Sequence, residues 1–222
     1  MPADDLARDA APLVEAVDVS VMLDDVVLLP PVSLAAHPGE TVVVTGANGS
    51  GKTTLLRVLA GLTRPTTGSA RVGGTAIDER DARYRRTLAA HLGLPPFARN
   101  LTVREHLTLV GASWGRTVVD AGDAADALLD RVGLRQLAQR FPHELSSGQT
   151  QLVALATVLA RPFDVLLLDE PEQRLDSSRL SLVGELLAEQ VARGATLVVA
   201  SHSAVLTDAL ADRVVPLDEQ AG

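Results

Sequence analysis

Residues 46–53 read GANGSGKT and fit the pattern G-x-x-x-x-G-K-[ST]. A short β-branched run at 41–45 precedes this stretch and a helical apolar pattern at 53–62 follows it. Glycines let several backbone N–H groups converge on one phosphate, and the N-terminus of the next helix adds partial positive charge. The spacing therefore predicts a phosphate-binding loop rather than a chance glycine-rich turn. Its candidate contact residues are Gly46, Ala47, Asn48, Gly49, Ser50, Gly51, Lys52, Thr53 and Thr54.

The lysine of this loop is unusual within the chain. Lysine and arginine together number 20, and Lys52 is the only lysine. A lysine ammonium is a compact charge on a slim stem, whereas the planar fork of arginine is too wide for a tight backbone loop. We therefore expect Lys52 to contact a phosphate and act in catalysis, and the hydroxyl of Thr53 to bind Mg²⁺.

Two adjacent carboxylates, Asp169 and Glu170, end the apolar run at 164–170. In a chain with a phosphate-binding loop, the first is expected to hold Mg²⁺ through water and the second to act as general base for an attacking water. The alternative is a solvent-exposed acidic pair at a strand end, which the preceding run VLLL makes less favoured. A bound nucleotide and Mg²⁺ are the ligands that these residues predict.

The elements that must position these residues indicate an α/β fold with a mainly parallel sheet, because predicted strands and helices alternate along the chain. An acidic turn at Asp24-Asp25 separates the first two strands, and a hairpin is predicted around Gly73-Gly74. Between about Arg80 and Arg161 the pattern is mostly helical. Strands are predicted at 14–23, 26–29, 41–45, 164–170, 195–201 and 213–217. Helices are predicted at 53–62, 102–114, 123–134, 148–160 and 178–194.

Composition limits the location and the partners of the chain. The net charge is −8 with both signs interspersed, which argues against a general nucleic-acid binder. The N-terminus is polar and acidic, and no run approaches the roughly 18 to 20 apolar residues that a spanning helix needs. Without cysteine there is neither a disulfide nor a cysteine-bound metal. We expect a cytoplasmic protein.

Three further motifs carry a resemblance to a known family. The stretch 145-LSSGQ-149 closely resembles the L-S-G-G-Q signature of ABC-type ATPases, 173-QRLD-176 resembles their D-loop, and Ser201-His202 resembles their switch histidine. The order of phosphate loop, signature and acidic strand is also that of the family. The resemblance runs from about Val14 to Leu217.

The resemblance implies that two such domains, as a homo- or heterodimer, pack head to tail around ATP. Ser146 and the backbone N–H groups of Ser147 and Gly148, within a signature completed by Gln149, would reach the γ-phosphate held by the other domain. Because these groups begin a helix, its dipole would favour the phosphate.

The remaining roles also come from the resemblance. His202 would bridge the γ-phosphate and the water at Glu170, although a lone histidine at a strand end can also be a satisfied core or turn residue. Asp176 would couple the two nucleotide sites. The implied fold is that of P-loop NTPases: a RecA-like, mainly parallel core with an N-terminal antiparallel β region and an inserted helical subdomain.

On this basis we expect a flexible N-terminus and one ABC ATPase domain. The expected boundaries are 1–12 for the N-terminus, 13–222 for the domain, 13–90 and 161–222 for its core, and about 91–160 for the helical subdomain.

The sequence departs from the family pattern at three places. The family's adenine-stacking aromatic is missing from its slot near Met22 or Leu23, so nucleotide affinity is expected to be weak or purine choice loose. The Q-loop glutamine is missing near Leu94, so either Mg²⁺ takes water there or turnover is slow. Ser147 replaces a usual glycine, and Gln173-Arg174 replace the small residues usual before the D-loop leucine.

The favoured function is an ATP-hydrolysing subunit that powers a separate integral membrane permease, with an exporter-like system preferred. It would lie on the inner face of the cell membrane through that partner, without binding nucleic acid. Two alternatives stay open: an ABC ATPase with no transport role, and a regulatory subunit that binds ATP but scarcely hydrolyses it.

Overall fold

The computed structural model describes residues 11–217, which form two compact units. Of these residues, the first unit contains 11–92, Phe163–Glu170 and 187–217, and the second contains Gly93–Pro162 and Pro171–Leu186. The expected flexible N-terminus lies, up to residue 10, outside the described residues. Within the described residues, no helix has both the length and the apolar character that crossing a membrane requires.

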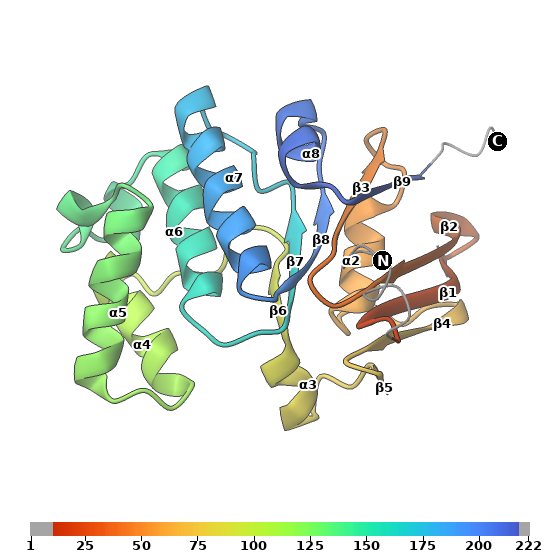
Figure 1. Ribbon diagram of the computed structural model, residues 1–222, viewed down its shortest axis with the longest axis horizontal. Coiled ribbons are helices and arrows are strands. Elements are labelled where there is room, and N and C mark those ends of the chain that lie inside the picture. The colour runs from red at the N-terminus through yellow and green to blue at the C-terminus, as the bar shows by residue number, and fades with distance from the viewer. Residues whose placement is uncertain (1–10, 218–222) are drawn as a thin grey trace, which may run out of the picture. The chain divides into compact units, whose positions relative to one another are not determined.

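A five-stranded parallel sheet forms one layer of the first unit, as predicted (Figure 1). Its strand order is β6-β7-β8-β3-β9, so the last strand is at an edge. Consecutive residues of the three central strands are buried. Their continuous Val and Leu runs are typical of strands that are buried on both faces of a parallel sheet. The strands are β3 (Thr41–Gly46), β6 (Leu88–His91), β7 (Val165–Asp169), β8 (Thr196–Ala200) and β9 (Arg213–Leu217).

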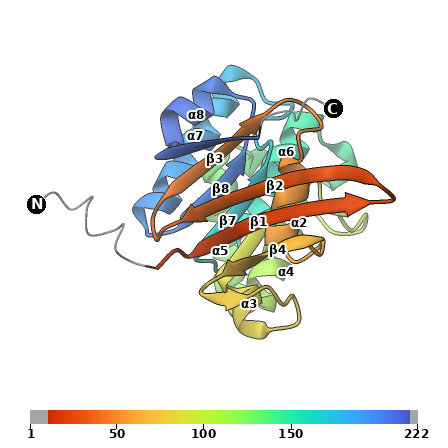
Figure 2. The ribbon, with the colours of Figure 1, turned by 90° about the vertical axis from the view of Figure 1, so that its right-hand side faces the viewer.

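A four-stranded antiparallel sheet, in the order β2-β1-β4-β5, confirms the predicted N-terminal β region (Figure 2). Its first turn places Asp24 and Asp25 at φ 47° and 65°, the left-handed conformation that tight hairpins need. The second strand continues past the predicted end through Pro30-Pro31, which an edge strand tolerates. The strands are β1 (Val14–Leu23), β2 (Val26–Ala36), β4 (Thr67–Val72) and β5 (Thr75–Ala76).

Helix α2 (Lys52–Leu59) packs between the two sheets (Figure 1). Leu55, Leu56 and Leu59 are completely buried there, in a core made almost entirely of Ala, Val and Leu. The apolar side of α2 thus fixes the direction in which its N-terminus, and the loop before it, points.

The first unit also contains elements that the sequence pattern did not reveal. Residues 80–91 were expected to be mostly helical, but only α3 (Ala82–Thr87) is helical there, and the next four residues form β6. Pairing with β7 overrides the local pattern, because it buries Leu88, Ala89 and His91 in the sheet. A short helix, α8 (Ala204–Leu210), follows β8 and was also not predicted.

The second unit is helical. An Arg104–Asp126 ion pair, with N–O distances of 2.8 and 3.0 Å, joins its first two helices. The guanidinium carbon of Arg161 lies 4.0 Å from the ring centre of Trp114. Helix α7 begins in this unit and ends in the first. The helices are α4 (Val103–Ser113), α5 (Val118–Arg131), α6 (Ser147–Leu159) and α7 (Ser177–Ala192), with 3₁₀ turns η1 (Arg135–Leu137) and η2 (Pro142–Glu144).

Substitution of Gly68 by alanine is expected to lower the free energy of unfolding by about 3 kcal/mol. Gly68 has φ +75°, and a Cβ there would lie 2.3 Å from the carbonyl oxygens of Val17 and Asp18. Gly74→Ala is the matched control, because Gly74 has φ +72° but no atom within 4 Å of its added Cβ. That control should cost only about 1 kcal/mol in urea unfolding. Equal losses would show that steric contact at Gly68 is unimportant.

The free energy of unfolding should depend on pH because His91 is buried. Burial lowers the pKa of His91 to about 4 in the folded protein, while the unfolded chain keeps a value near 6.5. The unfolded state therefore binds a proton first as the pH falls, so stability present above pH 6.5 is lost toward pH 4. Between pH 7 and 5 the loss should be about 2 kcal/mol.

The measurement is urea unfolding of the wild type and His91→Leu at both pH values. The variant should lose this part of the pH dependence. His143→Gln, at an exposed histidine, should keep the wild-type dependence. An unchanged pH dependence in His91→Leu would contradict the assignment.

Candidate active site

The glycine-rich loop connects the end of β3 to the start of α2, as its sequence predicts. At two positions of this loop a side chain would collide with neighbouring atoms, and φ is also positive, so both features require glycine. A Cβ on Gly46 would lie 2.5 Å from the carbonyl oxygen of Leu217, and one on Gly51 would lie 2.9 Å from that of Leu28. The loop is therefore held against β9 and β2 at van der Waals distance, which leaves room for backbone only.

The ammonium group of Lys52 lies inside this loop. Its Nζ donates hydrogen bonds to the carbonyl oxygens of Gly46, at 2.9 Å, and Ala47, at 2.8 Å. Lys52 is only 6% exposed. A wider guanidinium could not take this position without moving the loop, which agrees with the use of lysine here.

A hollow of about 640 Å³ opens beside the loop. It brings the phosphate-loop residues together with the predicted general base, Glu170, although these are more than 110 positions apart in the sequence. The sequence did not indicate the apolar residues of β2 that complete its lining. The lining residues are Val26, Val27, Leu28, Asn48, Gly49, Gly51, Lys52, Thr53, Thr54 and Glu170.

Glu170 and His202 form a direct pair at the ends of β7 and β8. The Nε2 atom of His202 lies 3.0 Å from Oε1 of Glu170, and the backbone N–H of Glu170 donates to the carbonyl oxygen of Ala200 at 2.9 Å. Glu170 has φ 47°, a sparsely populated conformation for a residue with a side chain. The hydrogen bond to Ala200 thus positions the backbone of Glu170, and the contact with His202 positions one oxygen of its carboxylate.

The predicted magnesium ligands are both in the first unit. Asp169 is the last residue of β7 and pairs in register with Ala200, while Thr53 lies in the first turn of α2 with an exposed side chain. Among residues 11–217, no group of three or more His, Asp or Glu side chains could hold a metal ion. Mg²⁺ bound to a nucleotide takes one or two protein oxygens and completes its shell with phosphates and water, and Asp169 and Thr53 offer such oxygens.

The signature residues belong to the second unit. Ser146 caps α6: its Oγ accepts the N–H of Gln149 at 3.4 Å, and the Gln149 side chain accepts the N–H of Ser146 at 2.9 Å. A Cβ on Gly148 would lie 2.8 Å from the carbonyl oxygen of Arg174. The glycine therefore lets the start of α6 approach the D-loop segment, and Ser147 is the first helical residue.

Asp176 immediately precedes α7 in the same unit. Its Oδ1 accepts the backbone N–H of Arg179 at 2.9 Å and the hydroxyl of Ser178 at 2.7 Å. These hydrogen bonds hold the pKa of Asp176 below its ordinary value. The signature and Asp176 are thus neighbouring parts of one unit, while the phosphate loop, Glu170 and His202 lie together in the other.

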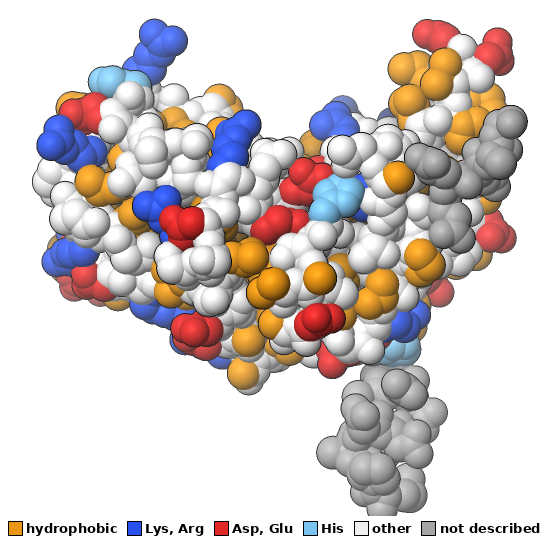
Figure 3. Space-filling model, turned by 90° about the horizontal axis from the view of Figure 1, so that it is seen from above, with side chains coloured by type: hydrophobic (Ala, Val, Ile, Leu, Met, Phe, Trp, Pro, Cys, Tyr) orange, Lys and Arg blue, Asp and Glu red, His pale blue; other side chains and the backbone are white. Residues whose placement is uncertain are grey.

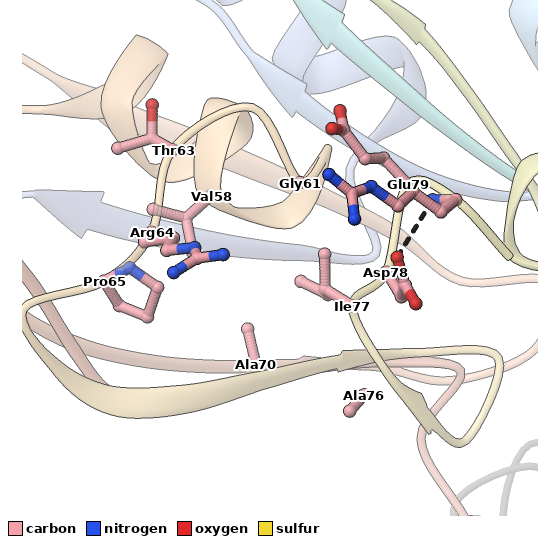
Figure 4. Close-up of a pocket in the computed structure, with 11 residues that line it drawn as sticks. Val58, Gly61, Thr63, Arg64, Pro65, Ala70, Ala76, Ile77, Asp78 and Glu79 are labelled. Carbon is pink, nitrogen blue, oxygen red and sulfur yellow. Dashed lines mark hydrogen bonds between the residues drawn. The ribbon is translucent and has the colours of Figure 1, made fainter.

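A second hollow, of about 540 Å³, is present in the first unit near the end of α2 (Figure 4). Val58, Ala70 and Ile77 form its apolar side, and Arg64 lies at its edge. None of its lining residues, all in the described part of the chain, is a predicted site residue. We assign it no part in the chemistry.

The surface seen in Figure 3 carries acidic, basic and hydrophobic side chains interspersed. This agrees with the mixed charge of the sequence, in which 28 Asp and Glu residues stand against 20 Lys and Arg.

Comparison with known proteins gives a consistent result. The sequence model of the family described as ABC transporter matches residues 29–173. The cytochrome c biogenesis ATP-binding export protein CcmA of Methylococcus capsulatus is 38% identical over 181 residues, which cover 82% of this chain and 86% of that protein. The putative hemin import ATP-binding protein HrtA of Staphylococcus saprophyticus is 32% identical over 196 residues, covering 85% and 86%.

One solved structure extends the likeness to three dimensions. The dimeric, post-hydrolysis state of the ATP-binding cassette MJ0796, bound to ADP and Pi, matches with a TM-score of 0.82 at 25% identity, covering 91% of this chain and 93% of that one. Other curated relatives are longer proteins, of which this chain spans 25%, 33% and 34%.

Proposed function

This chain belongs to the ABC transporter family of ATP-binding proteins and is an ATPase, and from this we propose that it powers a separate membrane-spanning subunit through ATP-driven, head-to-tail dimerisation. The observation that carries the proposal is the Glu170–His202 pair, 3.0 Å apart, with Glu170 in the hollow that also holds Lys52. A general base next to a phosphate-binding loop is the arrangement that hydrolysis of a nucleoside triphosphate needs.

Within one chain, the residues divide the work of hydrolysis. Lys52 and the loop N–H groups would bind the phosphates, and Glu170 would accept the proton of the attacking water. His202 would orient Glu170 and hydrogen-bond the γ-phosphate. Thr53 would hold Mg²⁺ directly and Asp169 would hold it through water. Mg²⁺, when bound, neutralises charge on the phosphates.

The second unit would act on the nucleotide of the other protomer. Ser146 and the N–H groups at the start of α6 would contact its γ-phosphate, and Asp176 would link the two sites. The dimeric state of the similar MJ0796 cassette supports this arrangement. The dimer can be homo- or heteromeric, since both kinds of dimer would place the signature of one protomer against the phosphate loop of the other.

We also infer a membrane partner and a direction of transport. We place the chain at the inner face of the membrane, bound to an integral permease, and in an exporter-like system. The name of CcmA, an export protein at 38% identity, supports export, whereas that of HrtA, at 32%, refers to import.

The experiment is to tag the chain in its native host, solubilise membranes in mild detergent with ATP, and identify what co-purifies. A multi-spanning membrane protein at near-equal stoichiometry is the expected result. A soluble partner alone, with nothing from the membrane, would favour an ABC ATPase without a transport role and would overturn the transport proposal.

A further inference from the structure

Arg174 has a backbone conformation that is unusual for a residue of its type. Within residues 11–217, the residues other than glycine with a positive φ are Asp18, Asp24, Asp25, Glu170 and Arg174. Aspartate tolerates this left-handed conformation, because its short polar side chain can hydrogen-bond locally. Glu170, at φ 47°, and Arg174, at φ 66°, lack that advantage. Backbone strain of this kind clusters at functional sites, and Glu170 is the predicted general base.

The strained residue lies against the start of α6. A Cβ on Gly148 would be 2.8 Å from the carbonyl oxygen of Arg174 and 3.0 Å from Nη1 of Arg179. Ser146 and Ser147, which begin this helix, are the residues next to Gly148 in the sequence. All of these residues belong to the second unit. A phosphate at the N-terminus of α6 would therefore have Arg174 beside it.

The two arginines of this segment differ in their contacts. Nη1 of Arg179 lies 3.6 Å from Oδ2 of Asp176, so its charge is partly balanced within the unit. The side chain of Arg174 is exposed and, in the part of the chain that the structure describes, has neither a hydrogen bond nor an ion pair. An exposed arginine is ordinarily only solvated. The strained backbone and the contact with Gly148 set Arg174 apart from such a residue.

The chemistry of arginine suits the phosphate that this helix is proposed to meet. In hydrolysis the water oxygen bonds to the γ-phosphorus and the bond from that phosphorus to the β–γ bridging oxygen breaks. ADP leaves with the electron pair of that bond, and Glu170 takes a proton from the water. A guanidinium is always charged and presents parallel N–H donors that match phosphate oxygens. Placed beside the γ-phosphate, it would stabilise the charge that develops during this step.

We propose that Arg174 is a catalytic residue that contacts the γ-phosphate of the ATP bound by a second copy of this chain. This inference rests on the proposed function, because the head-to-tail dimer brings the start of α6 to a phosphate that its partner holds. Within its own chain, Arg174 is not among the residues that line the hollow beside the phosphate loop. Since Arg174 departs from the family pattern, the contact is particular to this chain.

Steady-state ATP hydrolysis by Arg174→Ala is the first test. Its kcat is expected to fall by about 10²-fold. The dissociation constant of ATP for the monomer, measured by titration calorimetry, should stay unchanged, because Arg174 does not line the hollow of its own chain. Arg174→Lys keeps the charge without the planar pair of donors and should recover part of the lost rate.

Arg116→Ala is the matched control, because it removes an exposed arginine from the same unit. It should hydrolyse ATP at the wild-type rate. A wild-type kcat in Arg174→Ala overturns the inference, and so does a loss of kcat in Arg116→Ala equal to that in Arg174→Ala.

A mixing experiment tests whether Arg174 acts on the nucleotide of the partner. Arg174→Ala keeps its own phosphate loop and Glu170, while Glu170→Gln keeps Arg174. In a mixed dimer, the intact loop of the first variant meets the intact arginine of the second. An equal mixture should therefore hydrolyse ATP at least about 10-fold faster than the mean of the two variants measured separately. A mixture no faster than that mean overturns the inference, because an arginine that serves only its own chain would leave both sites of the mixed dimer defective.

Failure of the inference and failure of the proposed function give different results. If Glu170→Gln is slow and Arg174→Ala hydrolyses at the wild-type rate, only the role of Arg174 is lost. If the wild type is folded by circular dichroism but neither dimerises with ATP in analytical ultracentrifugation nor hydrolyses it, both fail.

Discussion

Replacing Glu170 with glutamine is expected to slow ATP hydrolysis by about 10²- to 10⁴-fold while leaving ATP binding largely intact. Glutamine keeps the size of the side chain and can still accept a hydrogen bond from His202, now 3.0 Å from Glu170 Oε1. It cannot take a proton from water at neutral pH. The loss should therefore appear in kcat rather than in nucleotide affinity, and the ATP-bound dimer should accumulate in analytical ultracentrifugation.

Glu185→Gln provides the control for this experiment, because Glu185 is an exposed glutamate of α7. It removes the same charge and should hydrolyse ATP at the wild-type rate. Should Glu170→Gln also keep the wild-type rate, Glu170 is idle. The chain would then be the weakly hydrolysing regulatory subunit that the missing glutamine and aromatic residue left open.

Replacing Lys52 with arginine should abolish most activity although it preserves the charge. The ammonium donates to two loop carbonyls at 2.8 and 2.9 Å from a position that is 6% exposed. A guanidinium is wider and flat, so it must either distort the loop or stay outside it. Losing one preorganised electrostatic contact of this kind costs about 10²- to 10³-fold in rate.

Steady-state ATPase assays and nucleotide titrations measure this effect, with urea unfolding to show that the variant folds. The reciprocal substitution Arg57→Lys is the matched control, since Arg57 is exposed on the same helix and its replacement adds a lysine. It should leave the rate unchanged. An active Lys52→Arg enzyme would mean that the single lysine of the chain is not required by the shape of the loop.

Much of the fold could be predicted because the local signals and the tertiary structure agree. The runs VVV at 42–44 and VLLL at 165–168 are apolar throughout and lie in central strands, and the loop between 46 and 53 matches a known phosphate-loop pattern. The elements that were missed depend on partners. The four residues of β6 are a strand only because β7 pairs with them, and β2 passes through two prolines only because its outer edge is free of a neighbour in the sheet.

The candidate site divides in the same way. The positions of Lys52, Asp169 and Glu170 at the end of a loop or strand could be predicted from residue type and pattern, while their chemical roles stay predictions. The distance between Glu170 and His202 could not, because it depends on the register of β7 against β8. Nor could the sequence show that Val26, Val27 and Leu28 line the hollow, since exposed and buried aliphatic residues of a strand have the same letters.

The contact between Arg161 and Trp114 has a practical consequence. Trp114 is the only tryptophan of the chain, and both residues lie in the second unit. Intrinsic tryptophan fluorescence therefore reports on the helical unit alone, whereas circular dichroism averages over every helix and strand. Recording both signals during one denaturant titration would show whether the two units melt as a single cooperative block or one after the other.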